Sequence, residues 1–201
     1  MHLVCLDLEG VLVPEIWIAF SEATGIPELK ITTRDEPDYG KLMNFRIGIL
    51  RDRGLALSDV RKVISGMEPL PGALEFVRAL RELSQFVVLS DTFTQFAQPL
   101  MAKLGYPTLF CNSLRVDSSG TIVGYEMRQA HGKRKSVEAL KSLNYRVFAA
   151  GDSYNDLEMI RAADSGTLFR APPSIIAQCG DLSTVDGYDG LLGRVDDFLA
   201  G

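Results

Sequence analysis

Histidine, cysteine and long apolar runs are all scarce in this chain of 201 residues. The two histidines, His2 and His131, are too few for a histidine-rich transition-metal site. Three cysteines, Cys5, Cys111 and Cys179, lie far apart and in odd number, so we expect neither a disulfide framework nor a zinc-ligand spacing. The chain opens without a basic leader, and no apolar run reaches the roughly 20 residues that cross a bilayer. We therefore expect a cytoplasmic protein with no membrane partner.

Positively charged residues are fewer than negatively charged ones. The 21 Lys and Arg residues face 26 Asp and Glu residues, for a formal net charge of −5, and no basic run is longer than His131–Lys135. Nucleic acid is therefore not expected as a partner. The chain is 46% hydrophobic and 23% charged, with 18 Gly and 9 Pro, which excludes collagen-like, low-complexity and largely disordered chains.

Short apolar runs rich in β-branched residues recur along the chain, and most of them end in small or acidic residues. They are Leu3–Leu6, Phe86–Leu89, Thr108–Cys111, Val147–Ala150 and Gly166–Phe169. Segments with helical periodicity lie between them. Buried strands that alternate with helices predict an α/β fold, a Rossmann-like parallel sheet flanked by helices, with its chemistry at the carboxyl ends of the strands.

Two stretches depart from this alternation. Residues 14–71 contain no convincing buried strand but three helical patterns, Trp17–Ala23, Lys41–Arg51 and Ser58–Ser65. We interpret them as a small helical cap inserted after the first strand, so that residues 1–13 and 72–201 form the catalytic core. The second stretch, residues 114–125, alternates on both sides of a Ser-Ser-Gly turn and predicts a β-hairpin.

Two acidic residues follow the first predicted strand. A strand places residues two apart on one side, so Asp7 and Glu9 can address the same point above the sheet. Paired acids repel each other unless a positive charge lies between them, and a hard divalent cation, most simply Mg2+, meets that need through oxygen ligands. The alternative is a strand that runs out into a solvated acidic loop.

A second acidic cluster, residues 151–156, follows the fourth predicted strand. Asp152 lies at the carboxyl edge, and Asp156 returns about one helical turn later. Asp7 and Asp152 would converge if their strands were neighbours in the sheet. The alternative is an ordinary helix N-cap at Asp152 or Ser153, although two acidic strand ends in one sheet favour a metal site.

Two further residues suit the binding of a phosphoryl group. Ser90 ends the second predicted strand, where its hydroxyl and the amides of the following helix could hold a phosphate. Lys133 precedes the helix that leads to the fourth strand and could neutralise charge on a transferring phosphoryl group. By spacing alone, Ser90 could equally be a helix cap, and Lys133 with Arg134 and Lys135 a solvated basic turn.

These groups stand in the order of the four motifs of the haloacid dehalogenase-like phosphohydrolases, which the chain resembles: Asp7-x-Glu9, Ser90, Lys133 and Gly151-Asp152-x-x-Asn155-Asp156. The resemblance spans nearly the whole chain. Within the superfamily the sequence looks most like the phosphoserine phosphatases, whose helical cap follows the first motif as residues 14–71 do here. More narrowly, it is similar to bacterial members that are both phosphoserine phosphatases and homoserine phosphotransferases.

The resemblance implies that Asp7 is a nucleophile that becomes an aspartyl-phosphate. It also implies Mg2+ bound by the side chains of Asp7 and Asp152 and by the backbone carbonyl of Glu9, whose carboxylate would act as the general acid and base. Such chemistry splits one phosphoryl transfer into two displacements, with metal and lysine stabilising the negative charge.

For the substrate, the resemblance implies that Ser90, Lys133 and Asn155 contact the phosphoryl group and that Asp156 orients the water shell of the metal. In the cap, Glu15 matches a glutamate that meets the substrate ammonium, with one residue fewer between it and Asp7. A cap helix supplies an arginine to the substrate carboxylate in the family. Arg46 and Arg53, two turns apart, are both candidates for it.

Two positions depart from the family pattern. Glu9 stands where Asp is usual, which moves the acid/base outward by about a bond length, ~1.5 Å. Asp91 and Thr92 stand where phosphoserine phosphatases tend to have Gly-Gly, so Asp91 is a candidate for substrate selection.

The prediction is therefore a Mg2+-dependent phosphoserine phosphatase, with transfer to homoserine as a further activity. One alternative is a phosphatase of another small phosphomonoester, such as a sugar or nucleotide phosphate. Another is a non-catalytic, receiver-like phospho-acceptor module, which also combines Mg2+, acids, a hydroxyl and a lysine on a parallel sheet. A P-loop kinase is not expected, because the chain has no Gly-x-x-x-x-Gly-Lys-Ser/Thr loop.

Overall fold

The computed structural model describes residues 1–33, 35–36 and 38–201, so Arg34 and Pro37 of the predicted insertion lie outside it. Its strands are β1 (His2–Leu6), β2 (Phe86–Phe93), β3 (Thr108–Val116), β4 (Ile122–Glu126), β5 (Arg146–Gly151), β6 (Ser165–Phe169) and β7 (Ser183–Val185). Its helices are α1 (Ile16–Thr24), α2 (Tyr39–Asp52), α3 (Leu57–Gly66), α4 (Ala73–Leu83), α5 (Thr94–Lys103), α6 (Gly132–Ser142), α7 (Leu157–Ala162), α8 (Pro173–Gln178) and α9 (Tyr188–Ala200). Short 3-10 turns span Pro27–Lys30 and Tyr154–Asp156.

The strands form one sheet in the order β4-β3-β2-β1-β5-β6-β7. All neighbouring strands run parallel except β3 and β4, which pair antiparallel as the hairpin. The predicted α/β architecture is confirmed. Because β1 lies between β2 and β5, the segments that follow these three strands meet at one edge of the sheet, as the placement of Asp7 and Asp152 requires.

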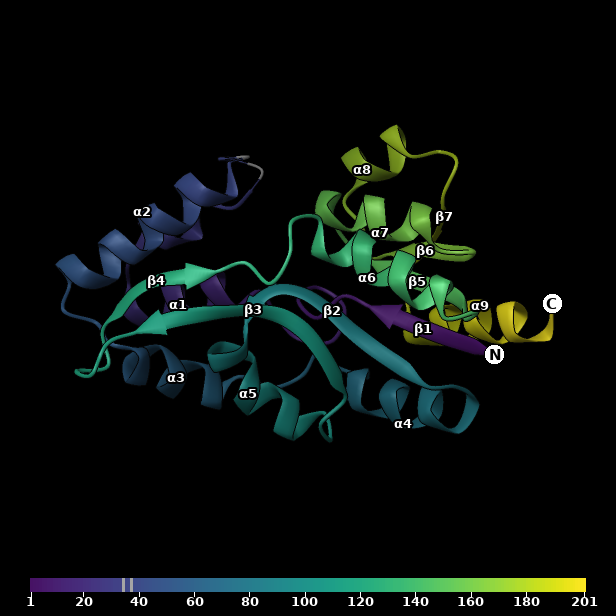
Figure 1. The fold of residues 1–201 in the computed structure, drawn as a ribbon, viewed down its shortest axis with the longest axis horizontal. Helices are drawn as coiled ribbons and strands as arrows, with labels where there is room; N and C mark the ends of the chain where they lie inside the picture. The colour runs from purple at the N-terminus through teal and green to yellow at the C-terminus, as the bar shows by residue number, and fades with distance from the viewer. Residues whose placement is uncertain (34, 37) are drawn as a thin grey trace.

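Helices cover both faces of the parallel strands. In β1, Val4 and Leu6 belong to one hydrophobic cluster with residues of α4, α5 and α9, whereas Leu3 and Cys5 belong to a second cluster with residues of α6, α7 and α8. Figure 1 shows α6 and α7 on one side of the sheet and α4 and α9 on the other. Burial on both faces explains why these strands read as continuous apolar runs in the sequence.

The insertion after β1 folds as α1, a 3-10 turn, α2 and α3, and its described residues form no strand. The carboxylate of Asp38 caps the N-terminus of α2 by accepting a hydrogen bond from the Lys41 backbone N–H at 3.0 Å. Trp17, Phe20 and Met43 of the insertion share the hydrophobic cluster of Val4 and Leu6, so the apolar interior is continuous across the two parts. In Figure 1, α2 lies beside β4. No helix among the described residues is both long and apolar enough to cross a bilayer.

Two predictions about strands were wrong. The third strand and the first arm of the hairpin are one strand, β3, which pairs with β2 through Thr108–Phe110 and Asn112 and with β4 from Ser113 onward. Its continuous apolar run stops at Cys111 because buried and exposed residues alternate from Asn112 to Arg115. Likewise, β2 does not end at Ser90 but continues to Phe93, through a register shift against β3.

Candidate active site

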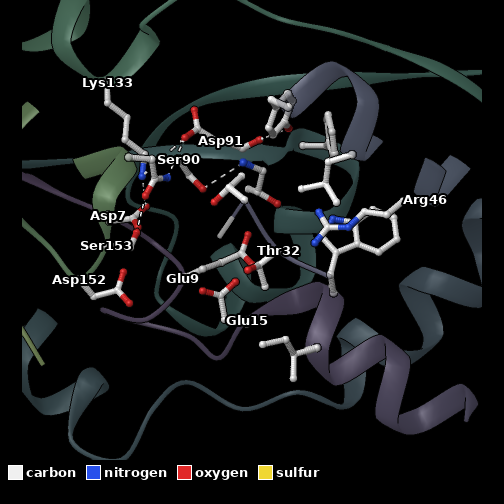
Figure 2. Close-up of a pocket in the computed structure, with 18 residues that line it drawn as sticks. Asp7, Glu9, Glu15, Thr32, Arg46, Ser90, Asp91, Lys133, Asp152 and Ser153 are labelled. Carbon is white, nitrogen blue, oxygen red and sulfur yellow. Dashed lines mark hydrogen bonds and ion pairs between the residues drawn. The ribbon is translucent and has the colours of Figure 1, made fainter. Parts of the chain in front are cut away.

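A pocket of about 300 Å3 lies at the carboxyl ends of β1, β2 and β5, between these strand ends and helices α1 and α2 of the insertion. Figure 2 shows Lys133 and Asp7 gathered at one end and Arg46 at the other, with Glu9 and Glu15 between them. The lining residues are Asp7, Glu9, Glu15, Trp17, Ile18, Thr32, Thr33, Tyr39, Leu42, Arg46, Ser90, Asp91, Thr92, Phe93, Lys133, Asp152, Ser153 and Asn155.

Lys133 lies at the centre of the phosphoryl end. The lysine is in the first turn of α6, not before the helix as predicted, and its ammonium is 2.8 Å from the Asp7 carboxylate and 2.7 Å from that of Asp156. Asp7 Oδ1 also accepts a hydrogen bond from the Leu8 backbone N–H at 2.7 Å. The three side chains are almost completely buried, so this is an interior ion network and not a solvated basic turn.

Asp156 is held by contacts of its own. Its Oδ2 accepts hydrogen bonds from the backbone N–H groups of Asp152 and Ser153 at 3.1 Å, while Oδ1 meets Lys133. Ser153 is the N-cap residue of the 3-10 turn, and its backbone N–H and its hydroxyl both donate to Asp156 Oδ2 at 3.1 Å. Gly151 permits this packing because a Cβ there would overlap the Asp156 carboxylate. Asp156 therefore fixes the lysine and the loop.

The acidic groups could hold a metal ion. One carboxylate oxygen each from Asp7, Asp152 and Asp156 lies within 4.8 Å of the others. Because Asp156 is occupied by Lys133 and two backbone amides, Asp7 and Asp152 are the carboxylates that fit a cation best. Gly10, with a φ of +77°, lets the β1 loop approach, since a Cβ there would overlap the Asp152 carboxylate.

Electrostatics also favour a cation at this place. Burial, followed by the charges of Asp156 and Asp152, raises the pKa of Asp7 well above its ordinary value. Burial and Asp156 raise the pKa of Asp152 to about 7. Burial opposes the charge of Lys133, but its acidic neighbours outweigh that effect and raise the pKa of the lysine. Three carboxylates against one ammonium leave excess negative charge in a buried site, which a divalent oxygen-seeking cation would neutralise.

Ser90 lies beside this network, but not in the predicted setting. Between Leu89 and Phe93 the register against β3 shifts, so that Ser90 lies in an irregular part of β2. Its hydroxyl accepts a hydrogen bond from the Thr92 backbone N–H at 3.2 Å, and α5 begins only at Thr94. Three β2 residues, Asp91 to Phe93, therefore separate Ser90 from the helix whose first amides were expected beside it.

Glu9 and Glu15 face each other in the middle of the pocket. Glu9 Oε2 accepts a hydrogen bond from the Ile16 backbone N–H at 2.8 Å, at the start of α1. Burial and the Glu15 charge raise the pKa of Glu9 to about 8. The Glu9 carboxylate lies outside the described acidic cluster of Asp7, Asp152 and Asp156 and is turned towards the start of α1.

The two candidate arginines differ. Arg46 is buried, donates a hydrogen bond to the Ile31 carbonyl at 2.8 Å and stacks on Trp17 with its guanidinium carbon 4.7 Å from the ring centroid. Its Nε is buried without a hydrogen-bond partner among the described residues. Arg53 follows the end of α2, has a 58% exposed side chain 3.9 Å from Glu28, and does not line the pocket. Arg53 was a candidate because it shares a helix face with Arg46, but it lies seven residues further along, which is ~10 Å along the helix axis.

Asp91 and Asn155 form part of the pocket wall. Asn155 Nδ2 donates a hydrogen bond to Asp91 Oδ2 at 2.9 Å, and Lys133 lies 3.9 Å from the same oxygen. Trp17 and Tyr39 also line the pocket but were not among the site residues predicted from the sequence. Trp17 lies two residues after Glu15, but no spacing indicates that its ring would support Arg46.

Comparisons with known proteins agree with this geometry. The haloacid dehalogenase-like hydrolase model matches residues 1–164. The chain is 56% identical over 191 residues to phosphoserine phosphatase ThrH of Pseudomonas aeruginosa, with 95% of this chain and 93% of that one covered. It is 54% identical over 191 residues to a phosphoserine phosphatase of Pseudomonas syringae, covering 95% and 81%. The fold matches a crystal structure of a phosphoserine phosphatase in apo form with a TM-score of 0.76, 23% identity and coverage of 93% and 94%.

Proposed function

Because the chain belongs to the haloacid dehalogenase-like hydrolase family, we propose that it is an enzyme that hydrolyses phosphoserine through a phosphorylated Asp7. The observation that carries the proposal is the buried Asp7 carboxylate, 2.8 Å from Lys133 at the end of β1, in a pocket that also holds Ser90 and an insertion arginine. The names of the two Pseudomonas relatives support this substrate. The hydrolase family leaves no reason to prefer a receiver-like module.

In the first displacement, an Asp7 carboxylate oxygen attacks phosphorus, and the bond between phosphorus and the serine oxygen breaks. Glu9 gives its proton to that leaving oxygen. In the second displacement, Glu9 takes a proton from water, the water oxygen attacks phosphorus, and Asp7 is released with inorganic phosphate. Lys133 and Ser90 hold the phosphoryl oxygens throughout, because both line the same end of the pocket as Asp7.

We propose Mg2+ as the cofactor, held by the side chains of Asp7 and Asp152 and by the backbone carbonyl of Glu9. When bound, it would neutralise the charge that spreads over the phosphoryl oxygens. Two further residues belong to this end of the site. Asp156 holds Lys133 and the backbone amides of the loop in place, and Asn155 forms part of the pocket wall through its hydrogen bond to Asp91.

The insertion end would read the amino-acid part of the substrate. Arg46 lines the pocket and its guanidinium suits a carboxylate, whereas Glu15 provides a counter-charge for an ammonium group. This use of both parts supports the proposed division into a catalytic core, residues 1–13 and 72–201, and a cap, residues 14–71. The three unpaired cysteines suit the reducing cytoplasm, which we propose as the location.

A phosphate-release screen across phosphoserine, phosphothreonine, sugar phosphates and nucleotides, with Mg2+ present, tests the proposal. We expect the highest kcat/KM for phosphoserine. Preference for a sugar phosphate or a nucleotide would overturn the substrate assignment and leave the other phosphomonoesters as the alternative. Transfer of the phosphoryl group to homoserine is a second candidate, favoured by the longer arm of Glu9 and by Asp91 in the wall.

A further inference from the structure

One hydrogen bond joins helix α2 of the insertion to the irregular part of β2. The hydroxyl of Tyr39, in the first turn of α2, donates to the backbone carbonyl of Asp91 at 2.9 Å. The two residues are 52 positions apart in the chain. Asp91 directly follows Ser90, so this bond connects the insertion to the residue that would hold the phosphoryl group.

The irregularity of β2 explains why the Asp91 carbonyl needs outside partners. Leu89 pairs with Phe110 and Phe93 with Asn112, so four steps along β2 correspond to two along β3. The two extra residues bulge from the ladder and cannot use its regular hydrogen bonds. A partly buried carbonyl still favours protein donors, and it has two lone pairs to offer.

Two side chains from different parts of the molecule meet that need. Asn112 is buried, donates its Nδ2 to the Asp91 carbonyl at 3.0 Å, and accepts a hydrogen bond from the Arg128 backbone N–H at 3.0 Å. Tyr39 supplies the other donor from the insertion. Asn112 belongs to the core sheet and Tyr39 to the insertion, so the second contact depends on the position of α2 over the strand end.

The ring of Tyr39 has separate support. It packs edge-to-face on Tyr125 of β4, with the ring centroids 5.9 Å apart. Burial and the nearby Asp91 raise the pKa of Tyr39 above its ordinary value, so the hydroxyl remains a donor at every physiological pH. Tyr39 and Asp91 line both the active-site pocket and a neighbouring cavity of about 480 Å3.

We propose that Tyr39 is a positioning residue for the phosphoryl site: its hydrogen bond to the Asp91 carbonyl sets the conformation of the Ser90–Thr92 bulge and makes the placement of Ser90 depend on closure of the insertion. The inference rests on the proposed phosphatase function and adds a residue to it. Tyr39 acts through the backbone and not by reading the amino acid, so its loss affects every phosphomonoester that uses Ser90.

The test is Tyr39→Phe, which keeps the ring packing and removes only the donor. Tyr125→Phe is the matched control. It removes the hydroxyl of the tyrosine that packs against Tyr39, and among the described residues that hydroxyl has no hydrogen bond to β2. We expect Tyr39→Phe to lower kcat/KM for phosphoserine and for an aryl phosphate by the same factor, about three- to tenfold, the effect of one neutral hydrogen bond. Tyr125→Phe should stay within twofold of wild type.

Hydrogen–deuterium exchange of peptides that cover residues 90–93, measured without substrate, gives a readout independent of turnover. We expect faster exchange there in Tyr39→Phe than in Tyr125→Phe, with a melting temperature within a few degrees of the wild type, far above the assay temperature. Wild-type exchange and kinetics in Tyr39→Phe would overturn the proposal, as would a loss confined to phosphoserine or one explained by a lower melting temperature. If wild-type enzyme does not turn over phosphoserine, the proposed substrate fails, while the exchange and aryl phosphate data still decide the role of Tyr39.

Discussion

The two ends of the pocket differ in how completely their charged groups are paired before a substrate arrives. At the phosphoryl end, Lys133 contacts Asp7 and Asp156, and Asp156 in turn holds backbone amides. At the insertion end, the Arg46 Nε is buried without a partner among the described residues, and Glu15 faces Glu9. The first arrangement is typical of machinery that is organised in advance, and the second of a surface that substrate completes.

This contrast has a physical origin. The phosphoryl end is built on strand ends whose neighbours are fixed by the backbone hydrogen bonds of the sheet, so its side chains have little freedom. The insertion end is built on helices that reach the pocket by side-chain packing and a few isolated hydrogen bonds, such as those between Tyr39 and Asp91 and between Ile16 and Glu9. A site whose catalytic groups are rigid and whose recognising groups come from a separate element can keep its chemistry while its substrate changes.

The largest expected effect is at the rigid end. We expect Asp7→Asn to lower turnover of phosphoserine and of an aryl phosphate by more than ~10^3-fold, because the amide keeps the shape of the carboxylate but is a very poor nucleophile. The melting temperature should not fall, since burial and the acidic neighbours disfavour the Asp7 charge in the folded protein. Circular dichroism and phosphate release measure both results, and wild-type turnover would rule out the covalent mechanism.

Metal removal should affect the same end. EDTA should stop hydrolysis and Mg2+ should restore it, because the buried carboxylates repel one another without a cation. Asp152→Ala should raise the Mg2+ concentration that gives half-maximal activity. Mg2+ should also raise the melting temperature of the wild type more than that of Asp152→Ala, since a ligand of the folded state stabilises it by mass action. Full activity in chelator would contradict the metal site.

At the insertion end the effect should depend on the substrate. We expect Arg46→Met and Glu15→Gln to lower kcat/KM for phosphoserine much more than for an aryl phosphate, because losing one partner of a desolvated charge contact costs ~2–5 kcal/mol, at least ~30-fold. Arg53→Met is the matched control, since Arg53 is exposed and outside the pocket. Equal losses on both substrates would indicate that Arg46 and Glu15 act by supporting the insertion.

The same contrast decides what could be predicted from the sequence. Asp7 and Asp152 follow apolar runs, and the carboxyl ends of parallel strands share one edge, so their convergence was predictable and is confirmed. Arg46 and Arg53 could not be separated, because helical periodicity gives the direction of a side chain but not its distance from a pocket that the helix only partly covers.

Contacts that depend on irregular backbone could not be predicted from the sequence. The hydrogen bond between Tyr39 and Asp91 needs both the bulge in β2 and the position of α2 above it, and neither leaves a periodic signal. Lys133 was predicted from its place in the motif order, but its contact with Asp156 requires the tight turn after Gly151. Sequence patterns therefore predicted the residues of this end better than the contacts among them.

Glu9 belongs to neither end, and the smallest expected effect is the change in product ratio when its side chain is shortened. Its carboxylate, one methylene longer than the usual Asp, is anchored to the Ile16 amide at the start of α1. A base placed towards the insertion can serve a bound alcohol as well as water, so we expect phosphoserine plus homoserine to give phosphohomoserine alongside free phosphate. Glu9→Asp should change the product ratio by a few-fold, because it moves the base without removing it, whereas Glu9→Gln should slow both reactions. Phosphorus NMR at fixed phosphoserine and increasing homoserine measures the ratio. If inorganic phosphate is the sole product at saturating homoserine, the position of Glu9 serves hydrolysis alone.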